Sequence, residues 1–575
     1  MKHNRLPILF LISLFCLSPL VFAAVPASQQ MGAIERAREL QQEQENLTNQ
    51  VEKQKTNEKN QENAPVVGPE GPTAKRVLVK SIEVTGVTLF PDYQIRAITS
   101  LYENKSLTFN EMQKVADLIT DLYRKNGYVI SRAYIPPQKI ENGVLEIKVL
   151  ESTVGTIQLK GNRYYSSNLI KSYLTIKSGQ PFNYNDLKKD LENINDHPDR
   201  SVKAVLAPGN QPGSTDIMLE EKDSLPVHVQ LGYNNYLSSF LGRNIYDSTF
   251  TDNNLLGHDD ILNFNYERGD NNVYYAYTTS YLYPVTHGLD LGASISHSKE
   301  VLGGAFAAVG SSGESDIYSF YGSQKLIKTY NITSHFNFGF DYKNVFNYLG
   351  GNVSSQDKLR IAKTGFDFQM DDDYGRTIIT DGLNFGIPDI MGGTRANIDD
   401  SDVPTSRAGA DGKFFMDDLN MMRLQKLPFD TSLLWRNNLQ FSPSKLTSTE
   451  QFQVGGPDNN RGYSPAEYVG DQGYTMNWDL GVPFYFIPRY WDVPGSKSSV
   501  YNATRLIGFY DWSNVHLNSL QPGDSKNRTI SSAGTGIKFD LPEGLSASYE
   551  IAWPLAAMPS DKKGVHQWIE VSVTF

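Results

Sequence analysis

The feature that most constrains the fold is the long C-terminal stretch from Leu225 to Phe575, which contains no convincing amphipathic helix. It consists of runs in which apolar and polar residues alternate, such as DILNFNYERG and YNITSHFNFGFDY, separated by turns of Gly, Asn, Asp and Pro. Strands of about 9–11 residues joined by turns and longer loops have the dimensions of a transmembrane barrel. At roughly 22 residues per strand and connection, this stretch predicts about 16 antiparallel strands.

The last run, WIEVSVTF, indicates how such strands would meet a bilayer. Its apolar residues share one face of an extended chain: Ile569, Val571, Val573 and Phe575. The other face carries Trp568 and three polar residues, and a period of two with one apolar face is what a lipid-facing strand requires. A spanning helix needs about 20 consecutive apolar residues, and no run after Phe22 approaches that length. The chain could therefore cross a membrane only as a closed barrel, with a soluble β-sandwich as the alternative.

Residues 1–23 have the pattern of a secretory signal sequence. Lys2 and Arg5 form a basic start, an apolar stretch follows, and the segment ends in VFA, which resembles a cleavage site. The single cysteine, Cys16, lies inside this segment, so we expect the processed protein to have no disulfide or thiol chemistry. A membrane anchor is the alternative, but the apolar run is short for one.

Residues 24–51 are expected to form a strongly polar helix. A thin apolar stripe that includes Ile34, Leu40 and Leu47 runs through a background of Gln, Glu and Asn. Such a stripe predicts a helix that is covered by water or loosely docked. Residues 52–75 lose this periodicity and gather Pro and Gly, which is typical of a flexible linker.

Two consecutive segments, 76–151 and 152–224, repeat one order of elements. Each has the pattern β-α-α-β-β, and IQLKG in the second segment echoes IEVTG in the first. Internal repetition is a signal of architecture. The sequence therefore predicts two tandem small α+β domains before the barrel region, 225–575.

A long polar loop, 455–473, interrupts the barrel region. Glycines and prolines surround Arg461, Gly462 and Tyr463, and a loop of this length is uncommon unless it has a role. Gly462 lets the backbone turn sharply. The guanidinium of Arg461 offers a fixed fork of donors to a carboxylate. A solvated surface loop is the alternative interpretation.

The sequence shows no catalytic, phosphate-binding or metal-binding motif. The sequence has no G-x-S-x-G elbow, no phosphate-binding loop, no H-E-x-x-H and no Cys-based metal site. We therefore expect no catalytic residue, no metal, no cofactor and no enzyme activity. Acidic residues outnumber basic ones, 64 to 53, which argues against nucleic acid as a partner.

Several motifs together resemble one family, the outer-membrane transporters of two-partner secretion (the TpsB family). IPPQKIENGVLEIKVLES resembles the end of that family's first POTRA domain, and GDQGYTMNWDL resembles the strand after its conserved loop. LTSTEQFQVGG followed by NNRGY resembles the approach to that loop, whose core is Val-Arg-Gly-Tyr/Phe, with Asn460 in the place of Val. The resemblance implies that 24–51 is a plug helix, that the two repeats are POTRA domains, and that the barrel has 16 strands.

The family also places a Phe-x-Asp-x-Gly motif on a barrel strand, whose Asp receives the loop Arg. The matching residues here are Phe509, Asp511 and Ser513, with Ser in the place of Gly. Period two sends these three side chains to one face and Tyr510 and Trp512 to the other. Because Tyr510 and Trp512 suit a lipid interface, we expect Asp511 to point into the lumen and to bind Arg461 there.

The resemblance implies a translocation pore of the bacterial outer membrane, with its POTRA domains in the periplasm. Its expected partners are an unfolded secreted exoprotein with an N-terminal secretion domain, outer-membrane lipid, and the barrel-assembly machinery that inserts it. We expect the exoprotein to add a strand to a sheet edge of the first POTRA domain, and we assign that edge to Tyr128, Ile130, Leu145 and Ile147. Whether the cargo is an adhesin, a haemolysin or a toxin stays open.

Two other functions fit parts of the same pattern. A barrel-assembly insertase of the same superfamily would share POTRA domains and a barrel, although such proteins usually have a different number of POTRA domains and lack the plug helix. A general porin would need neither the repeat nor the Arg461 loop.

Overall fold

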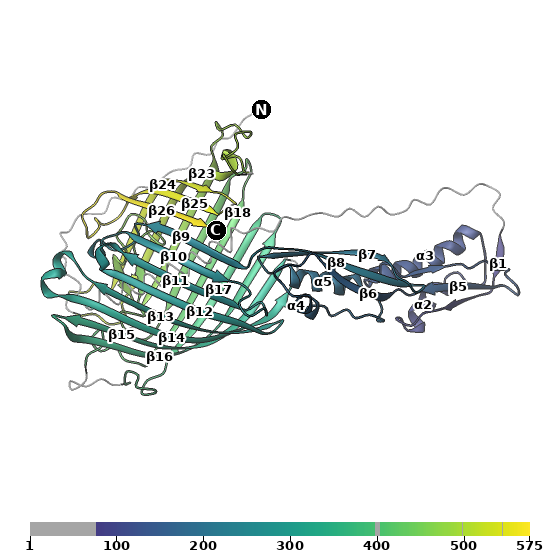
Figure 1. Cartoon of the computed structure of the whole chain (residues 1–575), viewed down its shortest axis with the longest axis horizontal. Coiled ribbons are helices and arrows are strands. Elements are labelled where there is room, and N and C mark those ends of the chain that lie inside the picture. The colour runs from purple at the N-terminus through teal and green to yellow at the C-terminus, as the bar shows by residue number, and fades with distance from the viewer. Residues whose placement is uncertain (1–75, 330, 397–402, 497, 522, 543) are drawn as a thin grey trace, which may run out of the picture.

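The computed structural model describes residues 76–575 except 330, 397–402, 497, 522 and 543. A wide barrel forms one end of the molecule, and two small α+β domains extend from it in a row (Figure 1). The predicted signal sequence, plug helix 24–51 and linker 52–75 lie outside the described residues, as do Ile34, Leu40 and Leu47.

The first small domain contains two helices, one three-stranded sheet and one short two-stranded sheet. Helix α3 begins with a capping box, in which Thr108 and Glu111 each bond the other's backbone N–H. Its apolar face packs on the sheet through Val115, Ile119 and Tyr123. The elements are β1 (Val77–Val79), β2 (Ser81–Thr85), α2 (Asp92–Thr99), β3 (Lys105–Leu107), α3 (Phe109–Lys125), β4 (Arg132–Tyr134) and β5 (Val144–Leu150).

The strand order of this domain corrects one prediction. The main sheet has the order β2-β5-β4, with β5 parallel to β2 and antiparallel to β4. Leu145 and Ile147 lie on the central strand β5 with 0% exposure, so they form the core and the assignment of these two residues to the sheet edge is wrong. Tyr128 and Ile130 lie in the turn before β4, which is an edge strand.

The second domain repeats this plan, as the sequence predicted. Its sheet has the order β6-β8-β7, again with a parallel pair and an antiparallel pair. The two domains touch where the Tyr184 N–H donates to the Gly127 carbonyl (2.8 Å) and Asn183 Nδ2 donates to the Asn126 carbonyl (3.0 Å). The elements are β6 (Thr153–Lys160), α4 (Ser167–Ser172), α5 (Tyr184–Ile194), β7 (Arg200–Pro208) and β8 (Ser214–Asp223).

Sixteen of the described strands close into one antiparallel barrel, as predicted. The first and last strands join from Glu570↔Asn234 to Thr574↔Gln230. The barrel strands are β9 (Val227–Asn234), β10 (Ile245–Asp252), β11 (Ile261–Gly269), β12 (Tyr274–Thr286), β13 (Leu289–Val301), β14 (Ser311–Lys328), β15 (Ile332–Leu349), β16 (Asn352–Asp372), β17 (Gly375–Gly386), β18 (Phe415–Lys426), β19 (Ser432–Phe441), β22 (Gln472–Pro483), β23 (Thr504–His516), β24 (Asn527–Asp540), β25 (Leu545–Pro554) and β26 (His566–Thr574).

Side chains of the barrel strands alternate as period two requires. On β26, Val571 is exposed on the outer face whereas Trp568 is buried inside. On β23, Tyr510 is exposed while Phe509 and Asp511 are buried. Both orientations confirm the predicted lipid-facing and lumen-facing sides. Among the described residues, no helix is long and apolar enough to cross a membrane.

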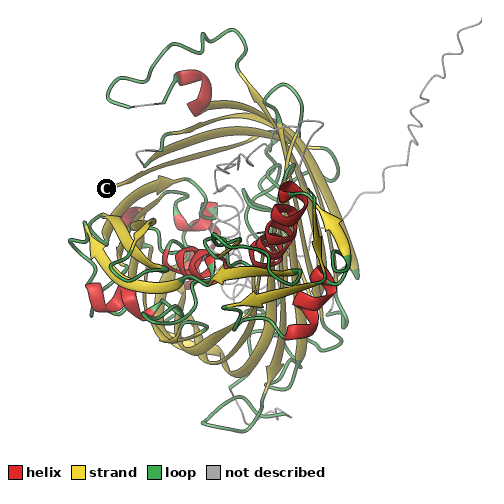
Figure 2. Ribbon diagram, turned by 90° about the vertical axis from the view of Figure 1, so that its right-hand side faces the viewer, coloured by secondary structure: helices red, strands yellow, loops and turns green. Residues whose placement is uncertain are grey.

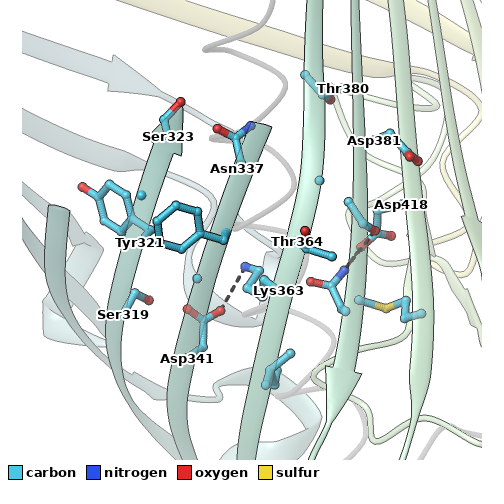
Figure 3. A pocket seen from close by; sticks show the side chains of 18 of the residues that line it. Ser319, Tyr321, Ser323, Asn337, Asp341, Lys363, Thr364, Thr380, Asp381 and Asp418 are labelled. Atoms are coloured by element: carbon cyan, nitrogen blue, oxygen red, sulfur yellow. Dashed lines mark hydrogen bonds and ion pairs between the residues drawn. The ribbon is translucent and has the colours of Figure 1, made fainter. Parts of the chain in front are cut away.

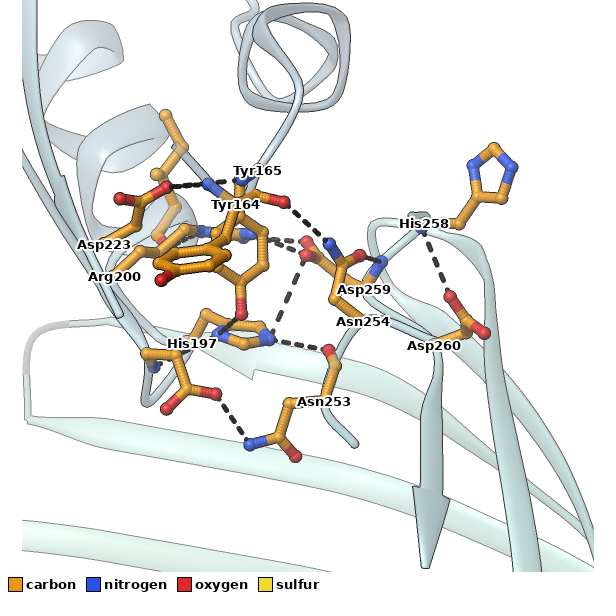
Figure 4. Close-up of polar contacts among 12 residues, drawn as sticks. Tyr164, Tyr165, His197, Arg200, Asp223, Asn253, Asn254, His258, Asp259 and Asp260 are labelled. Atoms are coloured by element: carbon orange, nitrogen blue, oxygen red, sulfur yellow. Dashed lines mark hydrogen bonds and ion pairs between the residues drawn. The ribbon is translucent and has the colours of Figure 1, made fainter. Parts of the chain in front are cut away.

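An ion pair fastens the second small domain to the barrel (Figure 4). Arg200, at the start of β7, binds Asp259 in the β10–β11 turn through two bonds of 2.5 and 2.7 Å. The Tyr165 and Tyr173 rings lie 5.0 and 5.2 Å from its guanidinium carbon, and Tyr173 also donates to Asp259. This buried, bidentate ion pair, flanked by two aromatic rings, fixes the orientation of the second small domain relative to the barrel.

A histidine reinforces this junction. Burial, together with the nearby Arg200 charge, lowers the pKa of His197. The neutral ring donates from Nε2 to the Asn253 carbonyl (3.0 Å), and its Nδ1 accepts from the Asp199 N–H (3.2 Å). The junction therefore does not depend on a charged imidazole.

Candidate functional site

The loop predicted over 455–473 is shorter in the structure: residues 455–467 fold back into the barrel on a short hairpin, and β22 already begins at Gln472. Strands β20 (Phe452–Val454) and β21 (Tyr468–Gly470) pair antiparallel and carry the loop between them. Gly455 and Gly456 both have φ of +105°, a backbone conformation that a side chain would strain. Backbone bonds within the loop, such as Tyr463 N–H to the Asn460 carbonyl (3.1 Å), make it compact. The alternative of a solvated surface loop is wrong for the tip.

Arg461 lies at the tip of this loop and binds Asp511, as the sequence predicted. Nε and Nη2 donate to the two carboxylate oxygens at 3.0 and 2.7 Å, and the Arg461 N–H adds a third bond at 3.0 Å. Arg461 is 2% exposed and Asp511 is 0% exposed. The guanidinium carbon also lies 3.4 Å from the centre of the Phe509 ring, so two of the three predicted wall residues contact Arg461 directly.

Two further carboxylates bind the same guanidinium, and the sequence analysis missed both. Nη2 donates to Asp479 on β22, and Nη1 donates to Glu550 on β25 at 3.3 Å. Asp479 also forms an ion pair with Arg436 on β19, in which Arg436 Nη2 lies 2.8 Å from Asp479 Oδ2. The role of Asp479 could have been predicted from the sequence, because Asp479 lies in the GDQGYTMNWDL stretch and the alternation of side chains places it on the lumen side. Arg461 therefore joins three wall strands, not one.

Gly462 and Tyr463 fix the loop tip against the wall. A Cβ on Gly462 would stand 2.5 Å from Ser532 Cβ and 2.9 Å from Pro554 N, so only glycine allows this approach. Tyr463 is fully buried and donates to the Ala557 carbonyl at 3.0 Å. Trp568 Nε1 donates to the Arg461 carbonyl at 2.8 Å, a contact that sequence reasoning did not foresee.

The two positions that depart from the family pattern touch each other. Asn460 Nδ2 donates to Ser513 Oγ at 3.1 Å and to the Ile530 carbonyl at 3.3 Å. Ser513 is the third predicted wall residue, and it is fully buried. A polar residue in the loop thus meets a polar residue in the wall; the hydrogen bond engages the Asn460 amide donor and the Ser513 hydroxyl, while Asn460 Oδ1 has no partner among the described residues.

Comparison with known proteins decides the family. The family model described as "Haemolysin secretion/activation protein ShlB/FhaC/HecB" matches residues 213–537, which is more than half of the chain. The chain belongs to this family. A second model, "POTRA domain, ShlB-type", matches residues 77–152. The family consists of outer-membrane transporters of two-partner secretion that work with secreted exoproteins, and their POTRA domains face the periplasm.

Individual relatives agree with this membership. The heme/hemopexin transporter protein HuxB of Haemophilus influenzae is 22% identical over 491 residues, covering 84% of each chain. The structure of CdiB from Escherichia coli superposes with a TM-score of 0.72 at 20% identity, over 96% of this chain and 100% of that one. BamA from Haemophilus ducreyi, solved without POTRA domains 1–3, reaches a TM-score of 0.53 at 15% identity, a similarity of fold alone.

A second buried ion pair ties three loops of this transporter at the end of the barrel away from the POTRA domains. Arg407, between β17 and β18, binds Asp471 and donates to the Leu446 and Ser519 carbonyls at 3.1 and 2.9 Å. Asp471 also accepts from the Asn518 N–H at 2.8 Å. Asp471 lies in a stretch that the sequence analysis quoted, whereas no local pattern marks Arg407.

Part of the lumen wall of the transporter is strongly polar. A hollow of about 570 Å³ lies against β14–β18, where Lys363 pairs with Asp341 at 2.9 Å and Asn384 donates to Asp418 at 3.0 Å (Figure 3). A wall of paired charges and amides suits water and a passing polypeptide more than an apolar ligand. In the part of the chain that the structure describes, no group of His, Asp and Glu could hold a metal ion.

Proposed function

We propose that this transporter captures one large exoprotein in unfolded form in the periplasm and passes it through the barrel lumen. The observation that carries the proposal is the Arg461 tip, which lies inside the barrel and is fastened to three neighbouring wall strands. A loop held in this way occupies the path and must keep a defined position while cargo passes. A general porin has no evident need for a loop that is held to the wall by the Arg461 ion pairs.

The test of this function is secretion of a defined protein. Cells that carry the transporter should release one large protein into the medium, and cells without it should retain that protein. Levels of other outer-membrane barrels should be equal in both. If other barrels fall in cells without the chain and no protein reaches the medium from either kind of cell, the chain acts in barrel assembly and the proposal is wrong.

We infer that cargo binds the free edge of the first POTRA sheet at β4. Tyr134 on β4 and Ile130 just before it are exposed, whereas Tyr128 is half-buried in the core. An extended segment added to this edge gains backbone hydrogen bonds, and the exposed side chains beside it supply specificity. An N-terminal secretion domain of the exoprotein is the segment we expect there.

The remaining partners belong to the membrane. We infer that outer-membrane lipid surrounds the outer face of the barrel and that the barrel-assembly machinery inserts it. The excess of acidic residues gives no reason to expect nucleic acid.

The predicted helix 24–51 is proposed as a plug that leaves the lumen at modest cost, because its apolar stripe is thin. Deletion of residues 28–50 should raise the single-channel conductance of the barrel in a planar bilayer. The deleted protein should still show heat-modifiable migration, which serves as the control for assembly. Unchanged conductance would remove the plug assignment.

A further inference from the structure

Two neighbouring loops on the POTRA side of the barrel present an unusual group of exposed aromatic rings. The loop between β18 and β19 contributes Phe429, which is 83% exposed, and the loop between β22 and β23 contributes Phe486 (81%) and Tyr490 (80%). Tyr485 and Trp491 are more than half exposed beside them. We call these five residues the aromatic patch. Single exposed rings are common, but five together mark a contact surface.

The loops under the aromatic patch are held in place by bonds between them. The Tyr485 hydroxyl donates to the Phe429 carbonyl at 2.8 Å. Arg489 binds Asp430 at 2.6 Å, and the Tyr501 hydroxyl donates to the same carboxylate at 3.1 Å. The short helix α6 (Val500–Ala503) follows and packs on the barrel strand β23. The rings are therefore presented by a braced scaffold.

The position of the aromatic patch indicates what it contacts. Strand β22 has 12 residues, about the length that crosses the apolar layer of a bilayer. Residues just after Pro483 therefore emerge at the periplasmic boundary of the membrane. The loop with α6 stands at the edge of the barrel in Figure 1, and it lies outside the ring of strands in Figure 2, away from the POTRA helices.

Apolar and aromatic side chains also cover the outer wall between the aromatic patch and the middle of the strands. Trp435, Trp478 and Tyr510 face outward in register on three adjacent strands, with the two indole rings 6.2 Å apart. Leu480 and Leu506 are exposed between this row and the loop. The outer wall is therefore apolar up to the aromatic patch, and the patch lies where this wall ends. Aromatic rings concentrate where a membrane protein passes from hydrocarbon to headgroups, because one end of the ring prefers each environment.

We propose that the aromatic patch inserts into the periplasmic leaflet of the outer membrane and binds phospholipid. The exoprotein is a less suitable occupant, because its route runs through the POTRA domains and the lumen and the patch faces outward. Binding there would fix the tilt of the barrel through the part of its periplasmic rim that the POTRA domains do not cover, as interfacial anchors do.

A unique label on the aromatic patch tests this proposal. The only cysteine in the sequence is Cys16, inside the predicted signal sequence, so Phe486→Cys gives one labelling site in the processed full-length chain. Tyr510→Cys on the lipid-facing wall is the positive control. Tyr93→Cys, an exposed position on α2 of the first POTRA domain, is the aqueous control. Each protein carries an environment-sensitive fluorophore in nanodiscs of phosphatidylethanolamine and phosphatidylglycerol.

The label at 486 should emit at shorter wavelength than the label at 93. Spin-labelled lipid should quench it several-fold more than the label at 93, and iodide should quench it less. Equal iodide quenching at 486 and 93, with no response to spin-labelled lipid, would overturn the proposal. Protection that appears only after unfolded exoprotein is added would assign the patch to cargo and also overturn it. Trp491→Cys offers a second site if Phe486→Cys does not fold.

Discussion

Replacing Arg461 with Ala should reduce secretion by about a hundredfold or more while the barrel still assembles. The change leaves Asp511, Asp479 and Glu550 without their shared cation, and breaking a buried pair costs about 3–5 kcal/mol. A loss of that size lowers the ratio of docked to undocked loop by about two to four orders of magnitude. The pairing of the sixteen barrel strands does not depend on this contact. We therefore expect the loop to leave its position while the barrel stays folded. Secreted exoprotein per unit of heat-modifiable barrel is the measurement.

The matched control is Arg423→Ala on β18. Arg423 binds Asp372 at 3.0 Å in a partly exposed pair at the periplasmic rim, and such pairs contribute about 0–1 kcal/mol. Secretion by this variant should be near normal. If Arg461→Ala secretes as well as Arg423→Ala, the tether has no role in transport.

The additional carboxylates change what a charge exchange should do. Considered as an isolated pair, Arg461→Asp combined with Asp511→Arg would restore the attraction. In the structure, an acid at position 461 would lie against Asp479 and Glu550, and like charges there repel. The double exchange should therefore fail to recover secretion. Arg461→Lys should recover part of it, since the charge stays and the bidentate fork is lost.

Deleting residues 76–151 should abolish export and leave a folded barrel in the membrane. The deletion removes the β4 edge where we expect cargo to bind. The second POTRA domain has its own apolar core and its own ion pair with the barrel, Arg200 to Asp259, so the remainder should still assemble. Export is measured in the medium and assembly by heat-modifiable migration. Persistent export would place cargo recognition elsewhere.

A point substitution tests the role of the β4 edge without removing the rest of the first POTRA domain. Ile130→Asp adds a charge next to β4 and should weaken export severalfold without unfolding the domain, because Ile130 is exposed. Tyr93→Asp, on helix α2 and also exposed, is the paired control and should export normally. Equal export by both variants would argue against the β4 edge.

The sequence by itself determined the features that depend on local pattern. A period of two with one apolar face gives each strand of 225–575 one side that faces water and one that faces lipid. The backbone N–H and C=O groups in lipid must all be hydrogen-bonded, which requires the strands to close into a barrel. The same parity placed Asp511 inside and Tyr510 outside. The motif around Arg461 then identified the pair, because each partner lies in a recognisable stretch.

Tertiary structure alone decided which residues gather from different strands. Asp479, Glu550 and Trp568 reach Arg461 because the barrel's register and closure bring β22, β25 and β26 to the loop tip, and no short window encodes that register. Arg407 and Asp471 meet through three loops for the same reason. Sheet order placed Leu145 and Ile147 in the core of the first POTRA domain, since an apolar strand has the same pattern in the centre of a sheet as at its edge.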